Sequence, residues 1–130
     1  MRVPRAAMLA VACLTIAGCG GITDPSKNTV EPFSGTLPVG GTTVHQFSSS
    51  KTGELSVKLT ALAPTSNGTV VLTWTQASGD TCGGVLNQAF AQLNVPTLSS
   101  QIVSGRYCIV VQDVGSFTVP QTYTIAVSHP

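Results

Sequence analysis

Few side chains in this sequence are suited to catalysis, and those few are scattered. His45, His129, Asp80 and Asp113 stand in separate segments. The chain contains no G-x-S-x-G nucleophile motif, no H-E-x-x-H metal-binding motif and no closely spaced pair of carboxylates. His45 lies in a predicted strand, where a structural role is favoured, and His129 is expected to fray beside the terminal Pro130. The sequence therefore predicts no catalytic residues and no enzyme.

The amino-terminal segment has the pattern of an export signal. Arg2 and Arg5 precede an apolar run over residues 6–17, which is the arrangement of a signal peptide. This run is shorter than the roughly 20 residues that a membrane-spanning helix needs. Residues 1–18 are therefore predicted to be a signal peptide, and the rest of the chain is expected to function outside the cytoplasm.

The end of this segment resembles the lipobox of bacterial lipoproteins, in which an aliphatic residue and two small residues precede a cysteine. Ile16, Ala17, Gly18 and Cys19 match that pattern. The resemblance implies cleavage before Cys19, its acylation, and permanent attachment to a membrane through several acyl chains. Because no aspartate follows Cys19, it also implies the outer membrane if the cell has two membranes. The alternative is an ordinary secretory signal peptide cut near residues 18–21.

Two of the four cysteines are not accounted for by the predicted signal peptide and lipidation. Cys13 lies within the predicted signal peptide and Cys19 is the predicted lipidation site directly after it, so Cys82 and Cys108 remain. Two cysteines in an oxidising compartment form a disulfide by default. The rival interpretation, a zinc site, usually needs four ligands, and both histidines lie in unrelated segments. A disulfide between Cys82 and Cys108 is predicted, with no metal and no cofactor.

The composition is poor in charge. Charged residues make up 8% of the 130 residues, against roughly 25% in an average soluble protein, while hydrophobic residues make up 42%. Residues 19–130 carry four basic and five acidic side chains, so the processed chain is nearly neutral. Such a chain has no electrostatic field to attract nucleic acid, which is excluded as a partner. A surface wetted by Ser, Thr, Asn and Gln favours exposed sheet over exposed helix.

Alternation of apolar and polar residues predicts strands separated by turns. The clearest case is 54–61, where Leu55, Val57, Leu59 and Ala61 are predicted to share one face. Trp74 stands in a similar apolar row, which assigns it to the core. Asn67-Gly68 is predicted to be a turn suited to positive φ. With almost no helical periodicity, the chain is predicted to be all-β, an antiparallel β-sandwich of about seven or eight strands.

The two cysteines occur in segments of different character. Residues 105–113 are predicted to form a central strand with Cys108 on the face opposite its tyrosine row. Residues 77–84 are predicted to be a loop that carries Cys82 and covers that face. Residues 85–96 fit either a short helix or an irregular strand and loop, and the β context favours the second.

Several segments together resemble the bacterial pre-peptidase C-terminal domain. They are F-S-G-T-L from Phe33, G-x-x-x-H-x-F at 41–47, G-E-L-S-V-K-L-T at 53–60, S-G-x-Y-C-I-V-V at 104–111 and Y-T-I-A-V at 123–127. The resemblance implies a jelly-roll-like β-sandwich, related to collagen-binding modules and often attached to secreted peptidases. Some relatives bind calcium through acidic loop residues. Asp80 and Asp113 alone fall short of the six or more oxygen ligands that calcium takes, so no calcium site is predicted.

These expectations describe a lipid-anchored, non-catalytic protein of the bacterial cell envelope. It has a signal peptide (1–18), a lipidated cysteine with a flexible tether (19–30) and a β-sandwich domain (31–130). The expected role is adhesion or binding of a glycan or an extended protein, and the alternative is a purely structural envelope protein without a dedicated ligand. Exposed aromatic and threonine residues on one sheet favour binding, whereas a uniformly polar surface without a groove favours the structural role.

Overall fold

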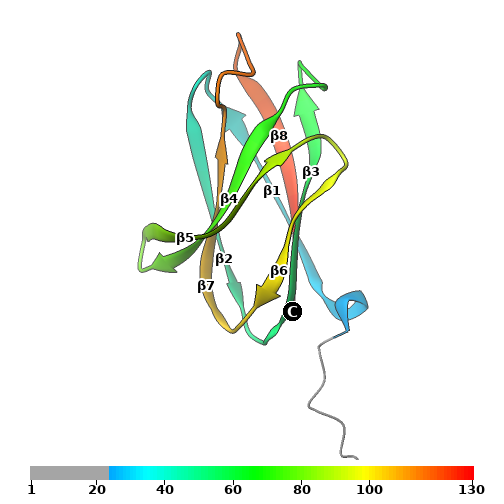
Figure 1. The fold of residues 1–130 in the computed structure, drawn as a ribbon, viewed down its shortest axis with the longest axis vertical. Helices are drawn as coiled ribbons and strands as arrows, with labels where there is room; N and C mark the ends of the chain where they lie inside the picture. The colour runs from blue at the N-terminus through cyan, green and yellow to red at the C-terminus, as the bar shows by residue number, and fades with distance from the viewer. Residues whose placement is uncertain (1–23) are drawn as a thin grey trace, which may run out of the picture.

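Residues 24–130 are described in this structure, a computed structural model, and they form two antiparallel sheets packed face to face (Figure 1). The predicted antiparallel β-sandwich is confirmed, with eight strands. The predicted signal peptide and Cys19 lie outside the described residues. The strands are β1 (Thr29–Leu37), β2 (Thr42–Ser49), β3 (Gly53–Ala63), β4 (Val70–Ser78), β5 (Thr81–Ala91), β6 (Pro96–Ile102), β7 (Gly105–Gln112) and β8 (Gln121–His129).

Strands that are far apart in the sequence lie side by side. One sheet has the order β1-β8-β3-β6 and the other the order β2-β7-β4-β5; we call them the β1 sheet and the β2 sheet. The pairing is nested, because β1 pairs with β8, β2 with β7, β3 with β6 and β4 with β5. A long antiparallel hairpin rolled up in this way is a jelly roll, the arrangement that the family resemblance implies.

The inward-facing rows of both sheets fill the core. Leu55, Val57 and Leu59 of β3 are completely buried, as the alternation predicted. The same prediction was wrong for Ala61, which is exposed because the register of β3 shifts between Leu59 and Ala61. β7 lies between β2 and β4, which confirms the prediction of a central strand there. Trp74 of β4 is 6% exposed, and its ring centroid lies 5.4 Å from that of Tyr107. The predicted core role of the tryptophan is therefore confirmed.

The ordered domain begins earlier than the predicted boundary at residue 31. A short 3-10 helix, η1 (Pro25–Lys27), is capped by Asp24, whose carboxylate accepts a hydrogen bond from the Ser26 N–H. The Asn28 side chain donates to the Glu54 carbonyl at 2.9 Å, and β1 begins at Thr29. Residues 24–30 thus belong to the folded unit and not to a tether. In the part of the chain from 24 onward, no helix has the length and hydropathy of a membrane span.

Three loops, 38–41, 64–69 and 113–120, lie at the end of the sandwich opposite the termini (Figure 1). The prediction of positive φ at Asn67-Gly68 was wrong, because neither residue adopts it. Glycine is required at 68 for a different reason: a Cβ there would lie 2.0 Å from Cε1 of Phe117, which is buried. Close approach of a phenyl ring, and not backbone conformation, selects this glycine.

The segment predicted as a loop around Cys82 is instead the tip of a hairpin. Its turn is at Gly79-Asp80, and Cys82 already belongs to β5. The pairing of β4 with β5 slips twice, at Trp74/Thr75 and at Thr75/Gln76, leaving Gly84 and Leu86 as extra residues on β5. Extra residues of this kind bend a strand and increase its twist. Of the two interpretations of 85–96, the irregular strand and loop is the correct one.

Candidate functional site

The outer faces of the two sheets differ in character. Hydroxyl side chains are common on the outer face of the β1 sheet, where the Ser34 and Thr124 hydroxyls are hydrogen-bonded at 2.8 Å and the Thr60 hydroxyl donates to the Thr124 carbonyl at 3.2 Å. This face also carries Lys58 and the exposed Val30. The outer face of the β2 sheet carries exposed apolar side chains, among them Val44 and Phe90, and is the better candidate for a binding site.

A shallow hollow of about 250 Å³ lies on the outer face of the β2 sheet, and we call it the Phe90 hollow. Phe90 is 72% exposed, an unusual value for a phenylalanine in a strand. Two glutamine amides flank the ring, and no charged residue contributes to the lining. The lining residues are Val71, Gln88, Ala89, Phe90, Gln112 and Val114.

The strand register shows which strands carry the residues that line the hollow. Gln112 of β7, Val71 of β4 and Phe90 of β5 form one row across the sheet, because Gln112 pairs with Val71 and Val71 with Phe90. Gln88 follows on β5, where its side-chain nitrogen donates to the Thr73 hydroxyl at 2.9 Å and leaves its amide oxygen free to accept. The site therefore depends on three adjacent strands and is as rigid as the sheet.

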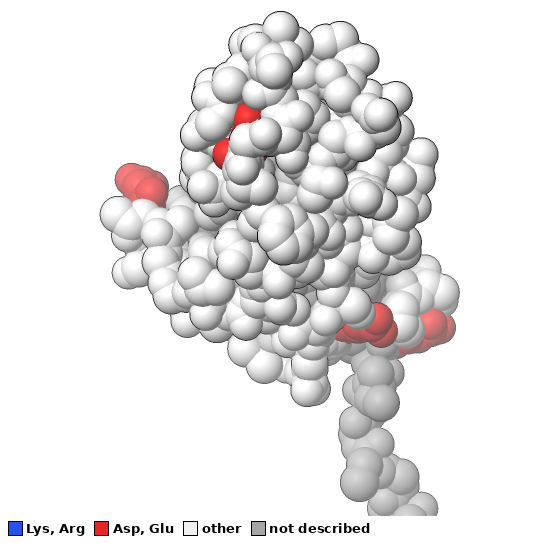
Figure 2. Space-filling model, turned by 45° about the horizontal axis from the view of Figure 1, so that its top comes forward, with Lys and Arg blue, Asp and Glu red and all other residues white. Residues whose placement is uncertain are grey.

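Asp113 holds the loop that forms the upper rim of the hollow. Its carboxylate accepts hydrogen bonds from the backbone N–H groups of Gly40, at 2.8 Å, and of Gly115 and Ser116, at 3.0 and 2.8 Å. The hydrogen bond from Gly40 contributes most to lowering the pKa of Asp113 from its ordinary value of 3.8. The bonds from Ser116 and Gly115 lower this pKa further, and burial opposes them. Val114 is thereby fixed beside the hollow. Figure 2 brings this end of the domain forward and shows no lysine or arginine there.

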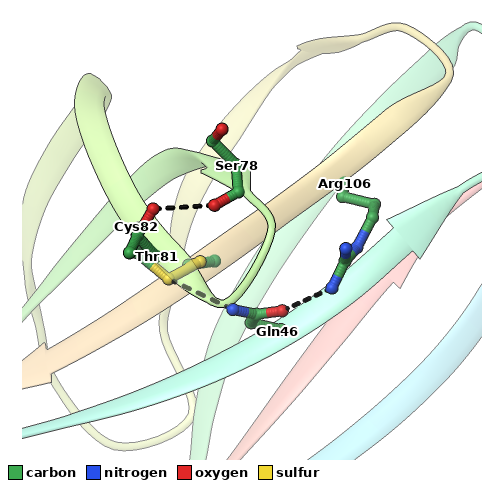
Figure 3. The surroundings of a disulfide bond; sticks show 6 residues. Gln46, Ser78, Thr81, Cys82 and Arg106 are labelled. Atoms are coloured by element: carbon green, nitrogen blue, oxygen red, sulfur yellow. Dashed lines mark hydrogen bonds between the residues drawn. A yellow bond between two sulfur atoms is a disulfide. The ribbon is translucent and has the colours of Figure 1, made fainter.

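The predicted disulfide between Cys82 and Cys108 is present (Figure 3). The two Cα atoms lie 6.1 Å apart although β4 separates their strands. The bent tip of the β4–β5 hairpin accounts for this, since it brings Cys82 over the outer face where Cys108 points. Gln46 lies beside the bond and accepts a hydrogen bond from the Arg106 guanidinium at 2.9 Å. A disulfide of this kind indicates an oxidising compartment outside the cytoplasm.

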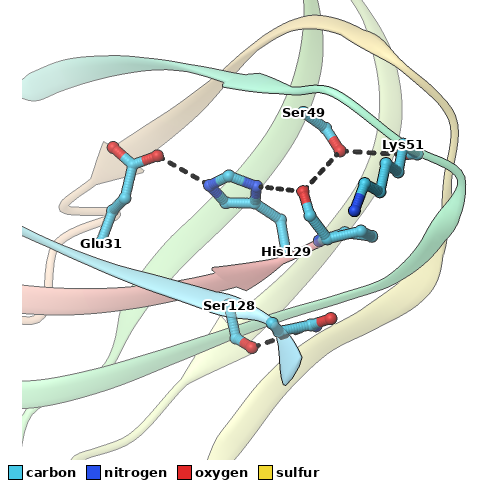
Figure 4. Close-up of polar contacts among 7 residues, drawn as sticks. Glu31, Ser49, Lys51, Ser128 and His129 are labelled. Carbon is cyan, nitrogen blue, oxygen red and sulfur yellow. Dashed lines mark hydrogen bonds and ion pairs between the residues drawn. The ribbon is translucent and has the colours of Figure 1, made fainter. Parts of the chain in front are cut away.

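His129 does not fray, contrary to expectation. It is 4% exposed, and its Nε2 lies 2.7 Å from the Glu31 carboxylate (Figure 4). Its ring packs against that of Phe47 with centroids 5.1 Å apart. These contacts tie the carboxyl-terminal strand to β1 and β2, so the histidine has a structural role.

His45 is also occupied by structural contacts. Its Nε2 lies 2.6 Å from the Tyr123 hydroxyl, which is hydrogen-bonded to Thr43 as well, and its ring stacks on Phe33. Burial lowers the pKa of His45 and raises that of Tyr123. Asp80, in the hairpin turn, lies on a different part of the domain. Over residues 24–130 no group of three or more potential metal ligands is found.

Sequence reasoning missed the Phe90 hollow. It placed Phe90 in an ambiguous segment and weighed it as part of a helix, because the extra residues on β5 interrupt the alternation of a strand. One signal was available: residues 81–105 contain no charged residue.

Two solved structures resemble this chain to different degrees, and the first of them supports the fold. The mitogen of Yersinia pseudotuberculosis aligns with a TM-score of 0.58 and 15% sequence identity, over 79% of this chain and 87% of that chain. The pre-peptidase C-terminal domain of a collagenase from Bacillus anthracis aligns with a TM-score of 0.43 and 17% identity, over 78% of this chain and 87% of that chain. No protein-family profile and no curated protein matches the sequence. The strand order and the nested pairing define a β-sandwich of the jelly-roll class.

Proposed function

We propose that this protein is a lipid-anchored, non-catalytic binding module of the bacterial cell envelope, whose ligand docks on the outer face of the β2 sheet. The observation that carries the proposal is the Phe90 hollow. An exposed phenyl ring beside further apolar surface is stabilised when a partner removes it from water. The flanking amides of Gln88 and Gln112 can donate and accept hydrogen bonds, which orients a ligand.

The chemistry of the hollow selects an uncharged ligand. No charged residue lines it, and the nearest carboxylate, that of Asp113, is engaged by three backbone N–H groups. A glycan or an extended protein segment without charge fits these groups. A structural role without a ligand would leave the asymmetry between the two outer faces unexplained.

The membrane anchor in this proposal is a lipid on Cys19. It is supported by the match of residues 16–19 to the lipobox and by the disulfide, which requires export. Cys19 is separated from Asp24 by four residues. An extended chain spans about 3.5 Å per residue, so the folded domain would stay within about 20 Å of the lipid surface. The hollow would lie at the far end of the sandwich.

The test is a pull-down of envelope polysaccharides and of immobilised peptides with the full chain in detergent. Phe90→Ala is expected to weaken binding about tenfold, because the ring is the main apolar contact. Val85→Ala is the matched control, since Val85 is 66% exposed on the same strand but does not line the hollow. Binding that is equally strong in wild type and Phe90→Ala would contradict the proposed site, and no binding at all would contradict the function.

A further inference from the structure

Asn67 and Gly68 form a dipeptide with a chemistry of its own, which the proposed function does not use. They lie in the 64–69 loop, at the end of the sandwich opposite the termini (Figure 1). An asparagine that precedes glycine can lose its side-chain amide spontaneously, because no side chain shields the following backbone nitrogen from the amide carbon. In a folded protein this reaction depends on whether other contacts engage the two groups.

The fold leaves both reacting groups free. The Asn67 side chain is exposed, and it makes no hydrogen bond to any residue of the described part of the chain. The Gly68 N–H likewise donates to no acceptor within residues 24–130. An amide hydrogen that is not engaged in a hydrogen bond is lost to base more readily than one that is. The Gly68 nitrogen can therefore act as a nucleophile toward the Asn67 side chain.

Contacts on either side of Asn67 hold the loop in place. The Thr65 N–H donates to the side-chain oxygen of Gln121 at 2.9 Å, and Gln121 is completely buried. On the other side, a Cβ on Gly68 would meet the buried ring of Phe117. Packing thus requires a glycine directly after Asn67, and this asparagine is exposed between two fixed points.

The other three asparagines of the chain lack this combination. The Asn28 side chain donates to two acceptors, and a β-branched threonine follows it. The Asn87 side-chain oxygen accepts a hydrogen bond at 2.8 Å from the Gln88 N–H, the group that would have to attack. Asn94 precedes Val95, whose branched side chain shields its own backbone nitrogen. These three asparagines are internal controls for the reaction.

We propose that Asn67 is a site of spontaneous deamidation in the folded protein. The Gly68 nitrogen bonds to Cγ of Asn67, the Cγ–Nδ2 bond breaks, and the side-chain nitrogen leaves as ammonia with the proton from Gly68. Water then opens the cyclic imide at either carbonyl, which gives aspartate or isoaspartate at position 67. Either product adds a negative charge to three loops whose only charged residue, Asp113, is buried. The reaction does not depend on the proposed binding function.

The two products differ in their effect on the loop. Isoaspartate routes the main chain through the side-chain carbon, which lengthens the backbone between Thr65 and Gly68. Because Gln121 holds one of these residues and Phe117 packs on the other, the longer backbone displaces the loop from its contacts. Aspartate leaves the main chain unchanged. Isoaspartate at position 67 therefore loosens the loop, whereas aspartate adds only the charge.

The test is incubation of the folded full chain, in detergent, in mildly alkaline buffer made with heavy-oxygen water, followed by peptide mapping by mass spectrometry. Asn67 is expected to exchange its amide for a heavy-oxygen acid at least about tenfold faster than Asn28, Asn87 or Asn94. The rate should rise with pH, because the attacking nitrogen must lose its proton. Asn67→Gln is the matched control and should stay unchanged, since glutamine would have to close a larger ring.

Conversion at Asn67 that is no faster than at the other three asparagines would overturn the inference. Conversion confined to the chain unfolded in urea would do so as well, because the fold would then protect the dipeptide. The isoaspartyl form, separated by ion exchange, should have a lower melting temperature than wild type. Asn67→Asp, which has the charge with a normal main chain, should melt like wild type, and equal melting of these two forms would refute the loosening of the loop.

Discussion

Asp113 is the only charged residue in the three loops opposite the termini, and it is buried. It joins the 38–41 loop to the 113–120 loop through backbone N–H groups, so its negative charge is balanced by aligned peptide dipoles. Such a carboxylate is a fixed part of the loop structure.

We expect Asp113→Asn to lower the free energy of unfolding at pH 7 by about 2 kcal/mol. The carboxylate accepts hydrogen bonds at both of its oxygens, whereas the amide has one oxygen and a nitrogen that cannot accept. The pKa of Asp113 is lower in the folded chain than in the unfolded chain. The unfolded chain therefore takes up the proton first as the pH falls, and the stabilisation present above about pH 4 is lost as the pH drops through the folded-state value. Urea unfolding at pH 7 and at successively lower pH should show wild type and variant converging.

Asp80→Asn is the control for this change, because Asp80 is exposed in the hairpin turn. It should alter stability by less than about 0.5 kcal/mol. A difference between wild type and Asp113→Asn that stays constant down to acid pH would contradict the role assigned to the carboxylate.

At the residue scale, sequence reasoning succeeded where a residue's role depends on its own strand. Trp74 and Cys108 were placed correctly because alternation decides which face each occupies. It failed where the role depends on a distant partner. His129 is ordered by Glu31, and Gly68 is required by Phe117, and neither contact leaves a local pattern in the sequence.

At the scale of elements, the β4–β5 hairpin is the most distinctive feature. Replacing Cys82 and Cys108 together by alanine should lower the free energy of unfolding by about 3.5 kcal/mol, since the disulfide closes a loop with a sequence separation of 26 residues. Denaturant curves of wild type with and without reductant measure the same quantity. The double variant should not respond to reductant, and wild type that keeps its stability after reduction would refute the estimate.

The 64–69 and 113–120 loops offer a second test of an element. Gly68→Ala should cost about 1–3 kcal/mol, because its Cβ would force Phe117 out of its buried position. Gly83→Ala is the matched control, since a Cβ there has no neighbour within 4 Å and its φ is not positive. Thermal unfolding of the two variants should separate them clearly, and similar melting temperatures would show that the loops adapt without cost.

Strands with a clean alternation were predictable and β5 was not. In β7 and in most of β3, every second side chain faces the core, so apolar and polar residues alternate in the sequence. The alternation breaks only at the bulge of β3 between Leu59 and Ala61. In β5 the exposed apolar residues Val85, Leu86 and Phe90 face outward, and two extra residues interrupt the register. An edge strand with bulges has no burial requirement strong enough to leave a periodic signal.

At the scale of the whole molecule, the proposed attachment to the membrane has the most direct test. Cells grown with a labelled fatty acid should incorporate label into the wild-type chain and not into Cys19→Ala. The physical reason is that the thiol is the acceptor for the lipid in the lipobox chemistry. Cys13→Ala is the control and should be labelled like wild type, whereas equal label in Cys19→Ala would exclude the anchor.

The nested pairing of the strands has a consequence for the order in which the chain can fold. Thr29 pairs with His129, so the first strand has no partner until the last strand has been made. Folds dominated by such distant pairings form slowly, because loop closure must precede the contacts that reward it. The sheet that contains β1 can therefore be completed only after the last strand has been synthesised. Removal of the whole of β8 would leave β1 without a partner strand, and we expect such a shortened chain to be unstable and sensitive to proteases.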